Sequence, residues 1–250
     1  MKTGPFLQAV LERQSCRKRS YWVLLDPDDF SIDEAVVVAR ESEKNGVNAI
    51  LIGGSLLHSN HFDKFTEAVK GSVGIPVVIF PGDSAQLSSH ADALLYLSLI
   101  SGRNPVNLIG EHVKAAPVIR QSGIEPVATA YMLVESGSVS SVEFMSNTRP
   151  LPRTKPDIAA AHALAAQYMG MHLVYLEAGS GAQLSVPPAM IKAVRSYVDI
   201  PIIVGGGIRD GKAAQEKLMA GADIIVTGNV ISKENGISVM QEIASVVSTF

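Results

Sequence analysis

Two stretches near the end of the chain decide the fold: residues 200–208, Ile-Pro-Ile-Ile-Val-Gly-Gly-Gly-Ile, and residues 222–229, Ala-Asp-Ile-Ile-Val-Thr-Gly-Asn. Each is a run of β-branched apolar residues that ends in glycine, a pattern typical of parallel strands buried on both faces. Glycine at a strand end lets backbone N–H groups approach an anion, and the next helix turns its N-terminus toward the same place. The pair therefore predicts the phosphate site that (β/α)8 barrels form after their last two strands. The alternative is that the glycines only permit tight turns.

The same alternation of apolar run and amphipathic segment extends back along the chain without a linker. The apolar runs predict strands at 21–25, 47–53, 76–80, 92–98, 124–131, 172–177, 200–205 and 222–227. Helices are expected between most of them, at 31–45, 61–70, 105–121, 156–169, 188–198, 210–220 and 233–247. Eight such units favour a (β/α)8 TIM barrel, formed by residues 1–250 as a single domain. An open doubly wound sheet is the weaker alternative, because no G-x-G-x-x-G follows the first strand.

Two connections depart from the regular pattern. The segment between the third and fourth strands, Pro81–Ala91, is too short for two loops and a full helix, so the third helix is expected to be missing or irregular. After the fifth strand, a long connection contains three cations within Arg149–Pro156. This connection is interpreted either as a functional loop on the active face or as a rigid prolyl bridge with solvated charges.

Composition excludes several classes of function. The formal net charge of −3 gives no electrostatic support to nucleic-acid binding. The single cysteine, Cys16, excludes an internal disulfide and agrees with a cytoplasmic location. No apolar run reaches the roughly 18 residues of a membrane span. The triplet Arg17-Lys18-Arg19 could make a transient contact with an anionic membrane surface, although such triplets are more often solvated helix ends.

Polar side chains follow the first two predicted strands, where a barrel carries its active site. Asp26 follows the first strand and Ser55 the second, after Gly53 and Gly54. A carboxylate in this place can hold a hard cation such as Mg²⁺, which in turn holds phosphate oxygens. The alternative for Asp26 is a helix cap before Pro27.

The sixth predicted strand ends in Tyr175-Leu176-Glu177-Ala178-Gly179-Ser180-Gly181. The period of two places Tyr175 and Glu177 on one face and Leu176 on the other. If Glu177 faces the barrel, its carboxylate lies at the mouth beside the predicted phosphate site. It could then accept a proton from a hydroxyl of a bound phosphate ester, the alternative being a structural ion pair with an arginine. His58 and His61 have H-x-x-H spacing without further ligands and are expected at the surface.

Taken together, these motifs resemble those of the geranylgeranylglyceryl phosphate synthase family. The stretches that carry the resemblance are Leu25-Asp26-Pro27-Asp28, Gly53-Gly54-Ser55, residues 175–181, Gly205-Gly206-Gly207-Ile208 and Thr227-Gly228-Asn229. Phe80-Pro81-Gly82 and Ser101-Gly102-Arg103-Asn104-Pro105 fit its group II, which includes archaeal and some bacterial members. The motif at 175–181 is specific, whereas the glycine motifs alone fit many phosphate-binding barrels.

The resemblance implies a Mg²⁺-dependent prenyltransferase that joins sn-glycerol 1-phosphate to a polyprenyl diphosphate through an ether bond. It implies that Asp26 and Ser55 contact Mg²⁺ and that the missing third helix leaves room for the prenyl chain. It also implies a glycerol phosphate site formed by Tyr175, Leu176, Glu177, Ala178, Gly179, Ser180, Gly181, Gly206, Gly207, Gly228 and Asn229. Glu177 is the predicted catalytic base, and a homo-oligomer is expected.

The sequence leaves more than one donor and more than one reaction class open. A C20 geranylgeranyl donor is expected, and a C35 heptaprenyl donor, as in the related bacterial heptaprenylglyceryl phosphate synthases, is the alternative. A sugar-phosphate isomerase or lyase would use the same phosphate site, but it would need a second acid–base group near Glu177. A barrel like thiamin phosphate synthase would need a pocket for an aromatic heterocycle, and a non-catalytic assembly subunit would bind neither phosphate nor metal.

Overall fold

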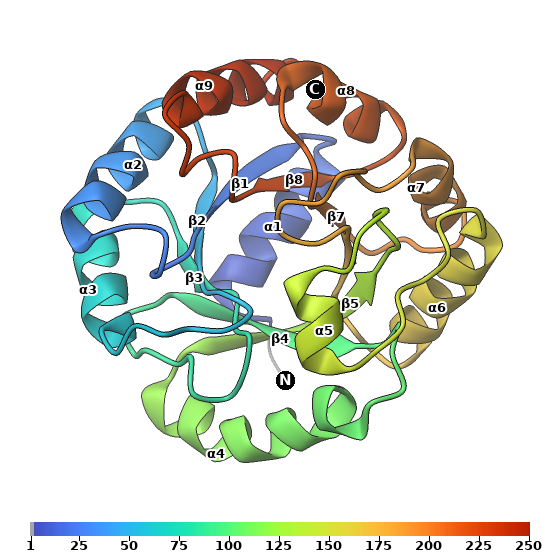
Figure 1. Cartoon of the computed structure of the whole chain (residues 1–250), viewed down its shortest axis with the longest axis horizontal. Helices are drawn as coiled ribbons and strands as arrows, with labels where there is room; N and C mark the ends of the chain where they lie inside the picture. The colour runs from blue at the N-terminus through green and yellow to red at the C-terminus, as the bar shows by residue number, and fades with distance from the viewer. Residues whose placement is uncertain (1–2) are drawn as a thin grey trace.

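Eight parallel strands close into a barrel in the computed structural model, which describes residues 3–250 (Figure 1). Neighbouring strands pair in chain order, and the last strand pairs with the first, with Val226 beside Trp22. The strands are β1 (Ser20–Leu25), β2 (Ala49–Ile52), β3 (Val77–Ile79), β4 (Ala93–Leu99), β5 (Glu125–Leu133), β6 (Leu173–Glu177), β7 (Ile202–Gly205) and β8 (Ile224–Thr227). The predicted TIM barrel is confirmed, with every strand found where the apolar runs placed it.

Helices surround the barrel and leave one position open (Figure 1). They are α2 (Ile32–Lys44), α3 (Phe62–Ser72), α4 (Glu111–Ser122), α6 (Pro156–Tyr168), α7 (Pro188–Arg195), α8 (Gly211–Met219) and α9 (Gly236–Val247). A π-helical turn, η1 (Val106–Gly110), leads into α4. The predicted capping box starts α2: Ser31 accepts from the Glu34 N–H at 3.3 Å, and Glu34 accepts from the Ser31 N–H at 2.9 Å. Among residues 3–250, no helix combines the length and apolar character needed to cross a membrane.

Side chains alternate between two apolar layers along each strand. One layer fills the barrel and includes Trp22, Leu51, Leu95, Val127, Tyr175, Ile203 and Val226. The other lies between strands and helices and includes Val23, Ile50, Leu94, Leu176, Ile202 and Ile225. Tyr175 and Leu176 therefore point to opposite sides of β6, as the period of two predicts.

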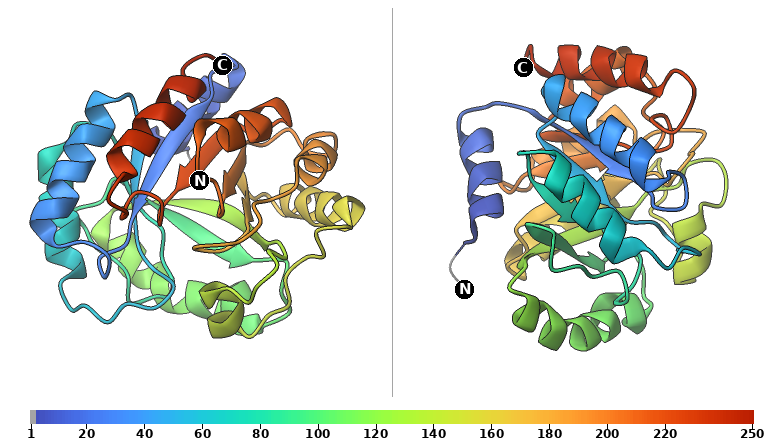
Figure 2. Two further views of the ribbon diagram at one scale, coloured as in Figure 1. Left: turned by 45° about the horizontal axis from the view of Figure 1, so that its top comes forward. Right: turned by 90° about the vertical axis from the view of Figure 1, so that its left-hand side faces the viewer.

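The N-terminal helix α1 (Pro5–Ser15), which the sequence analysis did not anticipate, covers the end of the barrel opposite α5 (Ser141–Ser146) (Figure 2). Phe6 and Leu7 of α1 are buried in the barrel layer, with the ring centroids of Phe6 and Trp22 5.6 Å apart. At the start of β5, Glu125 accepts hydrogen bonds from the Phe6 and Leu7 N–H groups at 2.8 and 3.0 Å. This carboxylate satisfies two of the free N–H groups at the helix N-terminus.

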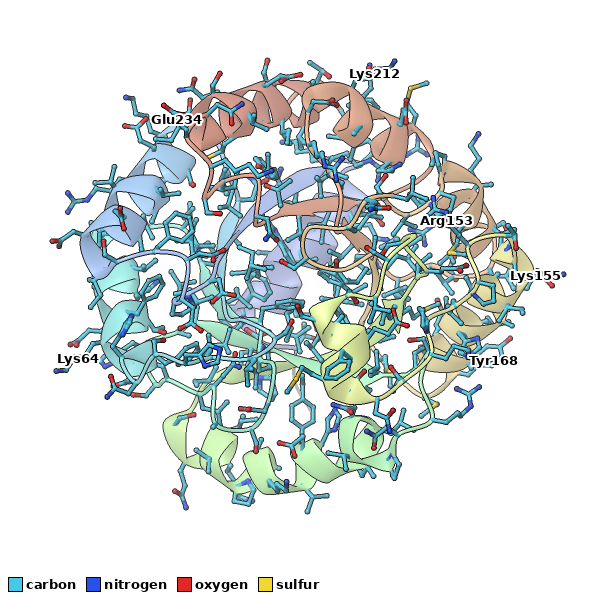
Figure 3. The ribbon with its side chains drawn as sticks, viewed as in Figure 1. Lys64, Arg153, Lys155, Tyr168, Lys212 and Glu234 are labelled. Atoms are coloured by element: carbon cyan, nitrogen blue, oxygen red, sulfur yellow. The ribbon has the colours of Figure 1, made fainter. Side chains whose placement is uncertain are left out.

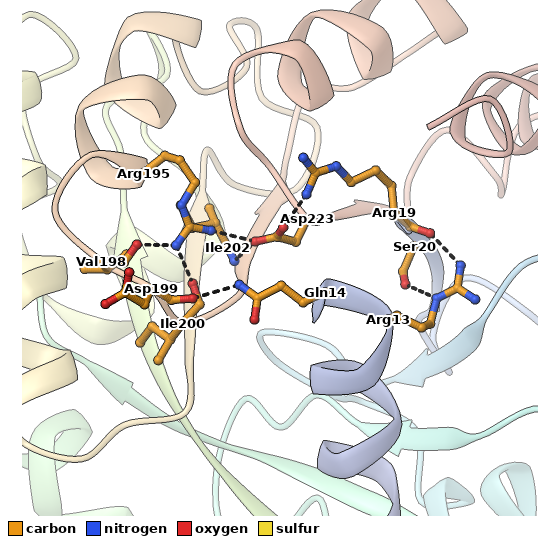
Figure 4. A network of polar contacts seen from close by, with 10 residues as sticks. All are labelled: Arg13, Gln14, Arg19, Ser20, Arg195, Val198, Asp199, Ile200, Ile202 and Asp223. Atoms are coloured by element: carbon orange, nitrogen blue, oxygen red, sulfur yellow. Dashed lines mark hydrogen bonds and ion pairs between the residues drawn. The ribbon is translucent and has the colours of Figure 1, made fainter. Parts of the chain in front are cut away.

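A polar network at the same end ties the strand starts together (Figure 4). Asp223, only 4% exposed, forms ion pairs with Arg19 and Arg195 and accepts from the Ile202 N–H at 2.9 Å. Gln14 of α1 donates to the Asp199 carbonyl at 2.8 Å. A buried carboxylate with two guanidinium partners and a backbone donor is well compensated for its lost hydration.

The segment between β3 and β4 contains only turns and bends, so the expected absence of a regular third helix is confirmed. Gln86, 4% exposed, holds this segment in place. Its side-chain oxygen accepts from the Gly82 N–H at 3.0 Å, and its amide donates to the Gly54 carbonyl at 2.8 Å. Glu111 of α4 accepts from the Ser84 N–H at 3.0 Å. The segment is therefore fixed to both of its neighbours without helical hydrogen bonds of its own.

The long connection after β5 folds back on the barrel rather than extending into solvent. It contains α5, and Leu151 forms a parallel bridge with Val134. The Arg153 guanidinium donates to the Glu135 and Ser185 carbonyls at 2.9 and 3.0 Å, whereas Lys155 points outward at the edge of the molecule (Figure 3). These contacts favour the structural interpretation of this loop.

Candidate functional site

Two cavities meet at the carboxyl ends of the strands. The first, which we call the glycine cavity, has a volume of about 120 Å³ and is enclosed by the ends of β1, β6, β7 and β8. The second, the side cleft, has a volume of about 310 Å³ and lies between the 81–91 segment, α4 and α5. Five residues line both: Gly54, Ser55, Phe80, Tyr131 and Val142. The two cavities therefore adjoin each other along these residues.

Backbone conformation explains the glycines of the glycine cavity. Gly206 and Gly207 have φ angles of 79° and 69°, a region that favours glycine. A side chain at Gly206 would place its Cβ 2.4 Å from Glu177 Oε1 and 2.7 Å from the Gly179 nitrogen. Gly206 is therefore required by both conformation and close packing. Across the cavity, Ser180 donates a hydrogen bond to Asn229 and so connects the loops after β6 and β8.

Glu177 is an almost fully buried carboxylate, 6% exposed, at the wall of the glycine cavity. Its Oε1 accepts from the Gly179 N–H at 2.6 Å. Burial raises the pKa of Glu177 to about 7, while hydrogen bonds from the Gly179 N–H, the Tyr175 hydroxyl and the Ala178 N–H favour the ionised form. A carboxyl group with a pKa near neutral pH can accept and release a proton, as acid–base catalysis requires. The structure gives it no arginine partner among residues 3–250, against the ion-pair alternative.

Asp26 also lines the glycine cavity, next to the backbone of Gly54. A Cβ at Gly54 would be 2.5 Å from Asp26 Oδ2, which shows how closely this carboxylate approaches the end of β2. Burial raises the pKa of Asp26 to about 6, and the charges of Asp29 and Asp28 act in the same direction. Asp28 accepts from the N–H groups of His58 and Ser59 at 2.8 and 2.9 Å. These bonds hold the loops that carry Asp26 and Ser55 together.

The donor set near Asp26 is compatible with a metal ion that takes few ligands from protein. Among residues 3–250, no group of three His, Cys, Asp or Glu side chains is arranged to hold an ion. Asp26 Oδ1 accepts from the Asp28 N–H at 3.0 Å, and Oδ2 faces Gly54 and the cavity. Magnesium commonly uses one or two carboxylates together with water and substrate phosphate oxygens, so this sparse arrangement fits it.

Apolar side chains form most of the side cleft. Leu87 contributes from the 81–91 segment, Leu94, Tyr96 and Leu97 from β4, and Val106 and Ala115 from the η1–α4 region. The cleft occupies the place where a third helix would otherwise cover the strands. It can therefore accept a long apolar group that begins at the glycine cavity.

Most of the predicted site residues line the glycine cavity. These are Asp26, Ser55, Tyr175, Glu177, Gly179, Ser180, Gly181, Gly206, Gly207, Gly228 and Asn229. Leu176 and Ala178 lie instead in the layer between strands and helices, so their side chains do not line it. The structure places His58 at the surface, and His61 stands half-buried at the start of α3.

Two cations of the glycine cavity were missed by the sequence analysis. Arg209 follows the glycines of β7, and Lys233 follows the loop after β8. Arg209 donates to the Ala182 carbonyl at 2.8 Å, which holds its guanidinium beside the cavity. Their positions just beyond two glycine-ended strands were the available signal, because cations there can reach an anion held by the backbone.

The fold and the site define a TIM barrel whose glycine-lined cavity adjoins an apolar cleft. Residues 13–247 match the model of the PcrB family, and the chain belongs to this family. It is 45% identical over 239 residues to a geranylgeranylglyceryl phosphate synthase of Chitinophaga pinensis, covering 96% of this chain and 94% of that protein. It is also 45% identical to the Thermococcus kodakarensis protein of the same name, over 96% of this chain and 94% of that one.

A solved structure shows the same architecture. The crystal structure of (S)-3-O-geranylgeranylglyceryl phosphate synthase from Thermoplasma acidophilum, in complex with its substrate sn-glycerol-1-phosphate, superimposes with a TM-score of 0.93. The two sequences are 34% identical, and the match covers 100% of both chains. The family resemblance read from the motifs is thereby confirmed.

A substitution at Gly228 tests the glycine cavity as an anion site. A Cβ at Gly228 would come no closer than 3.3 Å to Leu24, so the fold should tolerate a side chain there. Gly228→Val should block anion approach and raise the KM for sn-glycerol 1-phosphate by roughly 10-fold or more, with a much smaller change for the prenyl donor. Gly71→Ala, where a Cβ meets nothing within 4 Å, is the control. Equal effects of Gly228→Val on both substrates would contradict a separate phosphate site.

Proposed function

We propose that this protein is a prenyltransferase that joins sn-glycerol 1-phosphate to geranylgeranyl diphosphate through an ether bond and releases diphosphate. One observation carries the proposal: a glycine cavity with a buried carboxylate adjoins an apolar cleft, and five residues line both. The glycine cavity suits a polar acceptor, and the side cleft suits a long apolar donor whose reacting end must meet that acceptor. The names of the relatives and the complex of the Thermoplasma protein agree with this assignment.

In this proposal, the glycine cavity holds the acceptor. Backbone N–H groups at Gly206, Gly207 and Gly228 approach the phosphate, and Arg209 and Lys233 supply positive charge. Ser180 and Asn229 already share a hydrogen bond and present polar groups to the glycerol. Anchoring the phosphate fixes the position of the attacking hydroxyl, which gives the reaction an entropic advantage.

Glu177 is the base of the proposed reaction. Its carboxylate lies on the cavity wall beside the glycines that would hold the phosphate, so the glycerol hydroxyl can lie within its reach. The oxygen of this hydroxyl forms the new bond to the allylic carbon, and its proton passes to Glu177. The alternative of an isomerase or lyase barrel would leave the side cleft without a role.

Asp26 and Ser55 are the proposed contacts for Mg²⁺ at the junction with the side cleft. When bound, this ion would neutralise charge on the departing diphosphate. Asp26 contributes a carboxylate that burial makes costly to ionise alone, so a cation beside it would be favoured. Asp28 accepts hydrogen bonds from the His58 and Ser59 N–H groups, and these bonds hold the loops of Asp26 and Ser55 together.

The prenyl chain of the donor is proposed to lie in the side cleft. Burial of each CH₂ unit there would gain about 0.8 kcal/mol, so longer donors should bind better until the chain reaches the end of the cleft. A C20 donor is the first choice and a C35 donor the alternative. A homo-oligomeric state, a cytoplasmic location and transient contact with a membrane surface stay predictions.

A donor series tests the proposed activity. Purified protein is incubated with Mg²⁺, sn-glycerol 1-phosphate and radiolabelled C10, C15, C20 or C35 diphosphates, and the ether product is recovered by extraction. We expect kcat/KM to be highest with the C20 donor, because apolar burial grows with chain length only until the chain reaches the end of the cleft. The control acceptor is sn-glycerol 3-phosphate. A flat profile, or a preference for C10, would show that the cleft does not guide the chain, and absence of any ether product would refute the activity.

The metal assignment predicts the behaviour of Asp26→Asn. Loss of the carboxylate should reduce turnover at least 10-fold and raise the Mg²⁺ concentration needed for half-maximal rate, since a carboxylate is the preferred protein ligand. Binding of sn-glycerol 1-phosphate, measured by calorimetry without metal, should persist because it relies on other groups. Asp29→Asn, which changes an exposed neighbouring carboxylate, is the matched control. Parental activity of Asp26→Asn at low Mg²⁺ would rule Asp26 out as a ligand.

The role of Glu177 predicts two effects of Glu177→Gln. The single-turnover rate should fall by roughly 10²–10⁴, and the rise of the rate with pH through about 7 should disappear, because glutamine cannot accept the proton.

Since the folded pKa of Glu177 is raised from 4.5, Glu177 contributes stability at low pH that is lost as the pH rises through about 7. Denaturation at pH 5 and pH 8 should therefore show the variant gaining stability relative to the parent at the higher pH. An unchanged single-turnover rate would exclude Glu177 as the base.

A further inference from the structure

Three aromatic rings meet where the glycine cavity joins the side cleft. Phe80 stacks on Tyr175, with ring centroids 5.3 Å apart, and contacts Tyr131 edge-on at 5.8 Å. Tyr131 and Tyr175 complete the cluster with centroids 5.4 Å apart. Phe80 and Tyr131 line both cavities, and Tyr175 lines the glycine cavity. We call these three residues the junction rings.

The junction is where the reacting carbon of the donor must lie if the proposed function is correct. The acceptor hydroxyl lies in the glycine cavity with Glu177, and the chain of the donor lies in the side cleft. The allylic carbon C1 joins the diphosphate to this chain, so it must lie where the two cavities adjoin. Of the five residues that line both cavities, only Phe80 and Tyr131 are aromatic.

The surroundings of the rings would strengthen an interaction with positive charge. Tyr175 and Tyr131 are 1% and 7% exposed, so little water competes for a charge beside them. Burial also keeps the pKa of both phenols well above its usual value, so both rings stay neutral. The face of a neutral aromatic ring is electron-rich and attracts a cation, most strongly where the cation is desolvated.

We propose that the junction rings are catalytic groups that stabilise the positive charge developing on C1 of the prenyl donor. As the C1–O bond to diphosphate breaks, its electron pair leaves with the diphosphate and C1 becomes electron-poor. The glycerol oxygen supplies the pair for the new C1–O bond, and the proton of that hydroxyl passes to Glu177. The ring faces stabilise the charge between these two events, and they undergo no covalent change.

Fluorination of Phe80 tests this proposal with little change of shape. Phenylalanine carrying one, two or three ring fluorines is placed at position 80 by suppression of a stop codon, and single-turnover rates are measured with saturating substrates. Each fluorine withdraws electron density from the ring face, so the rate should fall stepwise, by roughly 3- to 30-fold over the series. The same series at Phe6, which packs on Trp22 at the far end of the barrel, should leave the rate unchanged.

Two leucine variants separate stabilisation of the charge from binding of the chain. Phe80→Leu and Tyr131→Leu keep an apolar side chain and remove the π face, so kcat should fall while the dissociation constant of the donor, from calorimetry, stays within about 3-fold. Tyr131→Phe, which retains the ring, should lose less than Tyr131→Leu. Parental rates across the fluorine series, or a loss confined to donor affinity, would overturn the proposal. A parent protein that forms no ether product would instead refute the proposed function, and donor binding to the leucine variants would then have no catalytic meaning.

Discussion

The site depends on room for one buried carboxylate. Glu177 ends β6 inside the barrel, and the neighbouring strand β7 ends in glycine where a side chain would collide with it: a Cβ at Gly205 would be 2.8 Å from Oε2, and one at Gly206 2.4 Å from Oε1. The glycines therefore serve two purposes. They leave space for the carboxylate, and they free the backbone N–H groups of the proposed anion site in the same cavity. The proposed base and the proposed anion site thus become neighbours through a single constraint on packing.

The open position in the helical ring has a comparable physical basis. Removing a helix from a TIM barrel exposes apolar strand surface and leaves the connecting backbone without helical hydrogen bonds. Gln86 supplies bonds for part of that backbone and links it to Gly54, and Glu111 binds it from α4. The apolar surface that remains, at Leu94, Tyr96 and Leu97, becomes the wall of the side cleft. The segment is thus held firmly enough to keep a cavity open beside it.

The strands could be predicted, because burial on both faces leaves short, continuous β-branched runs, and the period of two correctly separated Tyr175 from Leu176 on β6. The capping box of Ser31 and the missing third helix followed from equally local rules. The contribution of Gln86 could not be predicted, since a glutamine in a loop gives no sign of the distant backbone that it binds. Arg209 and Lys233 follow the two glycine-ended strands and could have been suspected from that position, but only the loop geometry places both at one cavity. The helix α1 binds to Glu125, 119 positions away from Phe6, and such contacts leave no local pattern.

The two ends of the barrel divide stability and chemistry between them. At the end covered by α1, Asp223 is buried with two arginines and a backbone N–H group, so its charge is compensated by the chain itself. At the other end, the buried Glu177 and the half-buried Asp26 have weaker compensation, and their pKa values rise to about 7 and about 6. Both carboxylates are thus easier to protonate than in water, so a bound cation or a proton would be accepted readily. The closed ring of strands carries the compensated Asp223 at one end and the poorly compensated Glu177 at the other, so the favourable ion pairs of the first can offset the unfavourable burial of the second in the stability of one fold.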